Sequence, residues 1–144
     1  MTRLAHIPAL LVALFIAGVA LFAPAPAAAQ ATSADVRVIL ASNDGSVDPA
    51  LASLAPRLTR QFSQFTAFRQ FSQRSIPLAV GAPQRVTLPG DQVATIELRS
   101  AQNGELEIRV SIPGGGTTVR TRGGMFFVGG APAPGGTVIL AIQT

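Results

Sequence analysis

Two carboxylates with a spacing suited to acid–base chemistry occur at Glu105 and Glu107. On a strand, residues two apart project from the same face, about 6–7 Å from each other. This separation is in the range used by glycosidases that act through a carboxylate pair. The surrounding alternation, however, places both glutamates on the exposed face of a short hairpin. We therefore expect them to serve solubility, with cross-strand ion pairs that join Glu97 and Arg99 to Arg109 and Glu107.

A second group of oxygen donors lies in the segment 43–48, which reads Asn-Asp-Gly-Ser-Val-Asp. Donors at alternate positions are typical of calcium-binding loops, but this segment lacks the closing glutamate. Asp48 also stands directly before Pro49, and this pair is typical of the first residues of a helix. We favour a helix cap over a calcium ligand, and the sequence predicts no metal or cofactor site.

Two glycine clusters, Gly114–Gly116 and Gly129–Gly130, could suggest phosphate binding. A phosphate-binding loop needs a helix directly after the glycines and, in its commonest form, a lysine. A strand-like pattern follows each cluster instead. We expect both clusters to form turns.

The composition removes several catalytic chemistries. The 144 residues include no Cys, Lys, Trp or Tyr, and the single histidine is His6. Nucleophilic catalysis by Ser or Thr requires a neighbouring base, and downstream of His6 only carboxylates or a terminal amine could supply one. We therefore expect a non-catalytic protein with no catalytic residues. A small hydrolase that relies on carboxylates is the alternative enzyme hypothesis.

Residues 1–29 have the features of a secretory signal peptide. Arg3 supplies the positive charge, the run Ile7–Ala23 is apolar, and Ala27–Ala29 matches the small-residue pattern before a cleavage site at Gln30. An uncleaved membrane anchor is the alternative, but the apolar run has 17 residues where about 20 are usual for a span. We expect export to the periplasm or the exterior, with a mature form that does not span a membrane.

Removal of this leader leaves ten arginines, seven acidic residues and a net charge of +3. The arginines are scattered, and the tyrosine and tryptophan that commonly stack on bases are missing. We therefore predict no binding of nucleic acid. Residues 30–34 are expected to form a flexible tail, and residues 35–144 one small β-rich domain.

The segment 36–40 is almost continuously apolar and rich in β-branched residues, which predicts a strand that is buried on both faces or central in its sheet. A helix is expected to begin at Asp48-Pro49, with an apolar stripe that comprises Leu51, Leu54, Leu58 and Phe62. Pro56 lies within this pattern and should kink the helix or split it in two, and Ser53 could then cap the second piece.

Four phenylalanines recur at every third residue, namely Phe62, Phe65, Phe68 and Phe71. This period matches neither a straight helix nor a strand. The spacing could form an aromatic ladder for a ligand or partner. We favour core anchors on different elements, with the helix ending near Phe62 and a strand starting near Phe68, because Phe lacks the polar group that makes Tyr and Trp common at binding surfaces.

The remainder of the chain predicts strands separated by turns. The expected strands cover residues 84–88, 92–99, 105–112, 117–122, 125–128 and 138–142. Pro89-Gly90 and Asn103-Gly104 are strong turn signals, and residues 129–136 read as a Gly/Pro/Ala loop. We expect an α+β fold: mainly antiparallel β, as a sheet or sandwich, with one kinked helical segment after the first strand.

Several of these segments together resemble a group of small secreted proteins from high-GC proteobacteria, especially myxobacteria-like lineages. The resemblance spans residues 36–142. It rests on the motifs Asp48-Pro49-x-Leu51-x-x-Leu54, Phe65-x-x-Phe68, Leu88-Pro89-Gly90, Val128-Gly129-Gly130-x-Pro132 and Gly136-x-Val138-Ile139-Leu140-Ala141-Ile142. This uncharacterised group implies an exported location and a fold, and no activity. Residues 127–130 also resemble a short piece of secretin outer-membrane channels.

The leading functional hypothesis is a module that binds or scaffolds a protein of the cell envelope. The expected contact surface is an exposed sheet edge or the Gly/Pro loops around Gly114 and Gly130. An accessory subunit of a secretion or outer-membrane assembly is the second hypothesis.

Overall fold

The computed structural model describes residues 32–144, so the predicted signal peptide and its anchor alternative lie outside the described residues. Among residues 32–144, no helix combines the length and apolar character needed to cross a membrane. The elements, in chain order, are β1 (Thr32–Ser42), a 3-10 turn η2 (Pro49–Leu51), α2 (Ala55–Gln61), β2 (Ala67–Leu78), β3 (Gln84–Leu88), β4 (Gln92–Gln102), β5 (Glu105–Ile112), β6 (Gly115–Thr121), β7 (Met125–Ala133) and β8 (Gly136–Gln143).

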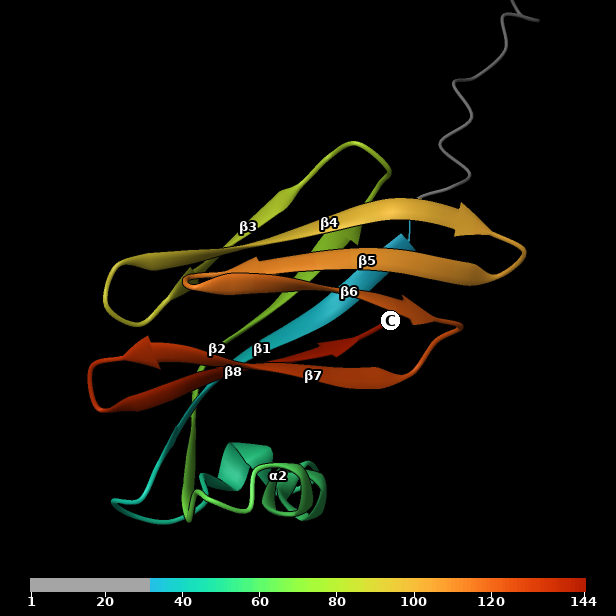
Figure 1. Cartoon of the computed structure of the whole chain (residues 1–144). Coiled ribbons are helices and arrows are strands. Elements are labelled where there is room, and N and C mark those ends of the chain that lie inside the picture. The colour runs from blue at the N-terminus through green and yellow to red at the C-terminus, as the bar shows by residue number, and fades with distance from the viewer. Residues whose placement is uncertain (1–31) are drawn as a thin grey trace, which may run out of the picture. The chain divides into compact units, whose positions relative to one another are not determined.

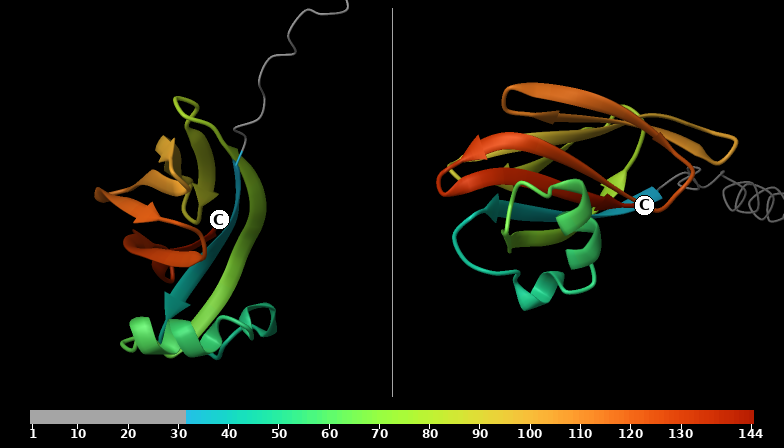
Figure 2. Two further views of the ribbon diagram at one scale, coloured as in Figure 1. Left: turned by 90° about the vertical axis from the view of Figure 1, so that its right-hand side faces the viewer. Right: turned by 60° about the horizontal axis from the view of Figure 1, so that its bottom comes forward.

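The strands form two antiparallel four-stranded sheets. The outer sheet has the order β3-β4-β5-β6, and the inner sheet has the order β2-β1-β8-β7. The helical segment lies on the other side of the inner sheet, so the fold has three layers (Figures 1 and 2). The prediction of a mainly antiparallel α+β sandwich with one helical segment is confirmed. The outer sheet is a simple meander, whereas the inner sheet joins strands from both ends of the described chain.

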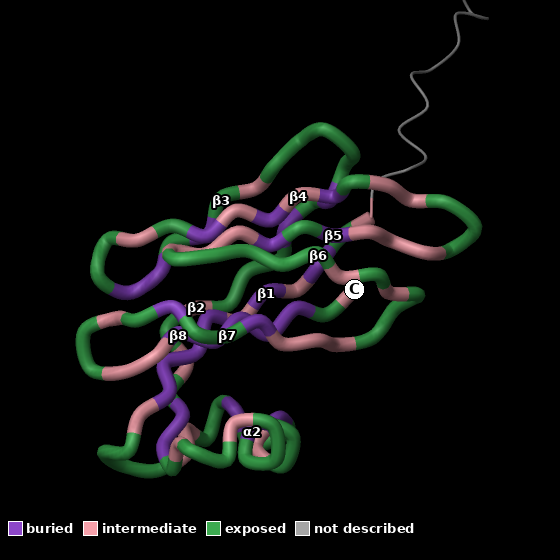
Figure 3. The backbone as a smooth tube through the Cα atoms, in the orientation of Figure 1, coloured by how far each residue is buried: buried purple, intermediate pink, exposed green. Residues whose placement is uncertain are grey.

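Two apolar clusters separate the three layers. One fills the space between the sheets and includes Val36 and Val38 of β1. The other fills the space between the inner sheet and the helical segment and includes Ile39 and Ala41 of the same strand. Figure 3 shows the resulting buried stretch in the inner sheet. The prediction that the first strand is central and buried on both faces is therefore confirmed.

The helical segment is split, as Pro56 predicts. Asp48 caps η2 through its side chain, and α2 starts with Pro56 in its first turn. Proline is tolerated there because the first amides of a helix have no partner within the helix. The predicted capping role of Ser53 is wrong, because Leu54 is the N-cap of α2 and makes no side-chain cap. Burial of the leucine stripe on the inner sheet positions α2 instead, with Leu51 and Leu58 fully buried.

The first three of the four phenylalanines pack into the core from different elements, as expected, but the fourth does not. Phe62 is the C-cap of α2, and Phe68 is buried at the start of β2. Phe62 and Phe65 pack against the cluster beneath the helical segment. Phe71, however, is 51% exposed and falls at a register shift between β1 and β2. A bulge leaves one residue without a cross-strand partner, so the expectation of a core anchor is wrong for Phe71.

Three segments expected to be irregular contribute to strands. The prediction that Gly114–Gly116 form a turn is wrong for Gly115 and Gly116, which begin β6 and pair with β5. Thr32–Ala34, predicted as part of a flexible tail over residues 30–34, pair with Ile76–Leu78 in β1 and β2. The predicted loop 129–136 is reduced to a turn at Pro134-Gly135, since β7 continues to Ala133 and β8 starts at Gly136. A register shift between Gly129 and Ala131 accommodates Gly130, whose φ is +114°. Pairing with β8 thus overrides the local turn composition.

Candidate functional site

The paired glutamates lie on the solvent face of the outer sheet. Glu107 Oε2 is 3.8 Å from Nε of Arg120 in β6, and Glu105 Oε2 is 3.7 Å from Nη2 of Arg122, directly after β6. The register places Glu97 opposite Arg109, but the described ion pairs do not join them, which corrects the predicted pairing with the preceding strand. Exposed pairs of this kind contribute about 0–1 kcal/mol.

The segment proposed as a possible calcium loop is anchored to β2 through Asp48. Its Oδ1 accepts a hydrogen bond from the amide of Ala50 at 2.9 Å, and its Oδ2 accepts one from the amide of Gln70 at 3.2 Å. The amide of Asp48 also donates to the carbonyl of Phe68 at 2.8 Å. The bond to Ala50 is the cap that the sequence predicts, and the bond to Gln70, which was not predicted, links the start of η2 to β2.

Asn43 is a second side chain of the segment that bonds to the backbone. Asn43 Oδ1 accepts from the amide of Thr66 at 3.2 Å, and Asp44 donates its amide to Ser42 Oγ. Within residues 32–144, no three His, Cys, Asp or Glu residues gather in a way that could hold a metal ion. The side chains of Asn43 and Asp48 thus fasten the connection between β1 and the helical segment.

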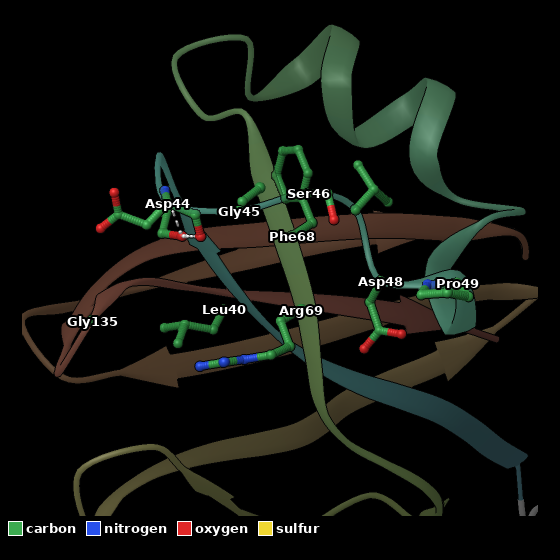
Figure 4. Close-up of a pocket in the computed structure, with 12 residues that line it drawn as sticks. Leu40, Asp44, Gly45, Ser46, Asp48, Pro49, Phe68, Arg69 and Gly135 are labelled. Carbon is green, nitrogen blue, oxygen red and sulfur yellow. Dashed lines mark hydrogen bonds between the residues drawn. The ribbon is translucent and has the colours of Figure 1, made fainter.

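A hollow of about 410 Å³, the loop hollow, lies beside this segment (Figure 4). Leu40 and Phe68 supply apolar walls, and Asp48 and Arg69 project to opposite sides of β2. The described ion pairs do not join these two charges. Asp44 is the third charged residue that lines the loop hollow.

The two Gly/Pro segments expected to form a contact surface meet in a second hollow. This hollow, the glycine groove, has a volume of about 300 Å³. It lies where the start of β6 faces the bulged part of β7. The residues that line it are Ile112, Pro113, Gly114, Gly115, Gly116, Thr117, Val128, Gly129, Gly130 and Pro132. None of these lining residues has an ionisable side chain.

The glycines of the groove have different physical roles. Gly129 allows close packing, because a Cβ there would lie 3.0 Å from the ring of Phe62. Gly114, Gly115 and Gly130 have no neighbouring atom within 4 Å of a Cβ position. Open space beside these three glycines leaves their backbone accessible in the groove.

The strands on either side of the groove are the end strands of their sheets. β6 ends the outer sheet and β7 ends the inner sheet, and they are not paired with each other. The turn Gly123-Gly124 connects them. The sequence singled out both segments, but it could not show that they meet. Comparison with models of known families, with curated proteins and with solved structures found no match.

Proposed function

We propose that this chain is a non-catalytic exported protein, periplasmic or secreted, that binds a protein partner of the cell envelope. The signal-peptide features of residues 1–29 support export. The glycine groove between the end strands β6 and β7 supports the binding role and is the observation on which the proposal rests.

The physical basis is strand addition. An end strand has backbone N–H and C=O groups that point away from its sheet, and an extended partner segment can pair with them. A groove without ionisable side chains keeps the cost of removing water low. Free backbone groups beside uncharged side chains suit the binding of a partner and not the catalysis of a reaction.

The non-catalytic character is supported by where the carboxylates lie. On an open face, Glu107 pairs with Arg120 of β6 and Glu105 pairs with Arg122, directly after β6, while Asp48 accepts hydrogen bonds from two backbone amides. These carboxylates therefore have structural partners and do not gather in an enclosed site.

Site-specific photocrosslinking in the native envelope tests the proposal. A photoreactive residue replaces Thr117 beside the groove, and a matched substitution replaces Thr87 on β3, at the opposite edge of the same sheet. Both side chains are exposed. We expect a discrete protein adduct from position 117 that the Thr87 variant does not form. Recovery of the free monomer alone from position 117, or identical adducts from both positions, would overturn the proposal.

A further inference from the structure

The two strands that border the glycine groove differ in how much free backbone they retain. β7 is interrupted by the register shift between Gly129 and Ala131. Pro132 has no N–H to donate, and its carbonyl already accepts a hydrogen bond from Gln92 Nε2 at 3.1 Å. At the other end of β7, the carbonyl of Met125 accepts from Arg57 Nη2 at 3.3 Å.

The start of β7 is also covered by the helical segment. The ring of Phe127 packs edge-on against Phe62 with 6.0 Å between centroids, and the Arg57 guanidinium lies 5.5 Å from the Phe127 centroid. The backbone of β7 thus already accepts side-chain hydrogen bonds near both ends, and a bulge interrupts the strand between them.

β6 is a regular strand by comparison. Its seven residues pair with β5 in unbroken register from Thr121 opposite Leu106 to Gly115 opposite Ile112. It contains no proline, and among the described strands it pairs with β5 alone, so that its other backbone edge has no strand partner there. β6 is therefore the better template for an added strand.

The two faces of β6 differ in charge. Gly115, Thr117 and Val119 stand opposite Ile112, Val110 and Ile108, which belong to the core between the sheets or pack against it. These three β6 residues therefore face the space between the sheets, where the glycine groove lies. Thr118 and Arg120 face solvent, and Arg120 is already paired with Glu107.

On the basis of the proposed function, we infer that a partner segment adds to β6 as a further strand of the outer sheet. Alternate side chains of this segment face the glycine groove and are uncharged, whereas the side chains between them face solvent and can be charged. The occupant is defined by this alternation, since a charge buried beside Gly115 and Val128 would find no counter-charge among the residues that line the groove. Strand addition supplies the affinity, and the alternate side chains supply the selectivity.

Three hexapeptides with blocked ends provide the test, with binding followed by amide chemical shifts of the purified protein. The first alternates threonine and valine, and the second alternates glutamate and valine. The third has the composition of the second but with adjacent glutamates, so that any register directs a glutamate into the groove. We expect the first two to bind within about threefold of each other and to shift the amides of residues 115–121. The third should bind at least about tenfold more weakly.

Two protein variants complete the test with the threonine–valine peptide. Gly115→Glu places a carboxylate at the groove face, where no atom lies within 4 Å of a Cβ position, and Thr118→Glu places one on the solvent face of the same strand. Gly115→Glu should weaken binding at least about tenfold, and Thr118→Glu should change it less than threefold.

Equal affinity of all three peptides, absence of binding by all three, or shifts confined to β2 or β3 would each overturn the inference. The photocrosslinking result is independent of these outcomes. A crosslinked partner together with peptides that bind equally would retain the proposed function and reject the alternating-charge rule.

Discussion

Removal of the Asp48 carboxylate should destabilise the protein more than removal of any other acidic side chain in its loop. The carboxylate accepts one hydrogen bond from Ala50 at the start of η2 and one from Gln70 in β2. Loss of an N-cap costs about 1 kcal/mol, and a hydrogen bond to a charged group contributes about 1.5–3 kcal/mol. Because Asp48 is partly exposed, we expect Asp48→Ala to cost about 2–3 kcal/mol.

Asp48→Asn separates the two contributions. The amide retains one oxygen acceptor, but its NH₂ group would face the second backbone donor. This variant should therefore lose about 1 kcal/mol. Asp44→Ala is the matched control from the same loop, since the described contacts of Asp44 involve its backbone and not its carboxylate. It should change stability by less than about 0.5 kcal/mol.

Urea unfolding followed by far-ultraviolet circular dichroism measures these differences and suits a chain without Trp or Tyr. With a denaturant dependence of about 1.5–2 kcal/mol per molar, Asp48→Ala should lower the midpoint by about 1–2 M. Equal midpoints for the Asp48→Ala and Asp44→Ala variants would refute the assignment of Asp48 as the link between the helical segment and β2.

Three further substitutions test the packing and the surface. Gly136→Ala should cost at least about 1–3 kcal/mol, because a Cβ would overlap the carbonyl of Ala41 on β1; a melting temperature equal to that of the unaltered protein would contradict this. Leu58→Ala should cost about 2–5 kcal/mol, because this side chain is fully buried between α2 and the inner sheet. A decrease of less than about 1 kcal/mol in the free energy of unfolding in urea would show that α2 is loosely packed. Glu107→Gln breaks only the exposed pair with Arg120 and should change the free energy of unfolding by less than about 1 kcal/mol, whereas a larger loss would indicate a role beyond surface charge.

Local signals predicted those parts of the fold whose partners lie nearby in the chain. Asn103 and Gly104 have φ of 56° and 77°, as expected for a tight hairpin, and the hairpin sets the register of β4 against β5. The turn at Pro89-Gly90 also forms with positive φ at Gly90. Each of these predictions depends on the conformational preferences of a few neighbouring residues.

Features that depend on distant pairing were not predictable in this way. Residues 129–133 have a turn-like composition and become strand only because β8 pairs with them. The exposure of Phe71 follows from a bulge opposite β1, and a bulge leaves no simple mark in the spacing of apolar residues. The contact surface was predicted as two separate loops. Their union in the glycine groove depends on how the two sheets stack, which no local pattern encodes.

The position of β8 has a consequence for the time at which this molecule can fold. β8 lies between β1 and β7 and supplies residues to both apolar clusters. The inner sheet therefore cannot close until residues 136–143 have been synthesised, and β1 must remain without one of its neighbours until then. Pairing between strands so far apart in sequence slows folding. For a chain that we propose is exported, this delay would keep the polypeptide unfolded and able to pass through a narrow channel, with folding completed on the far side of the membrane.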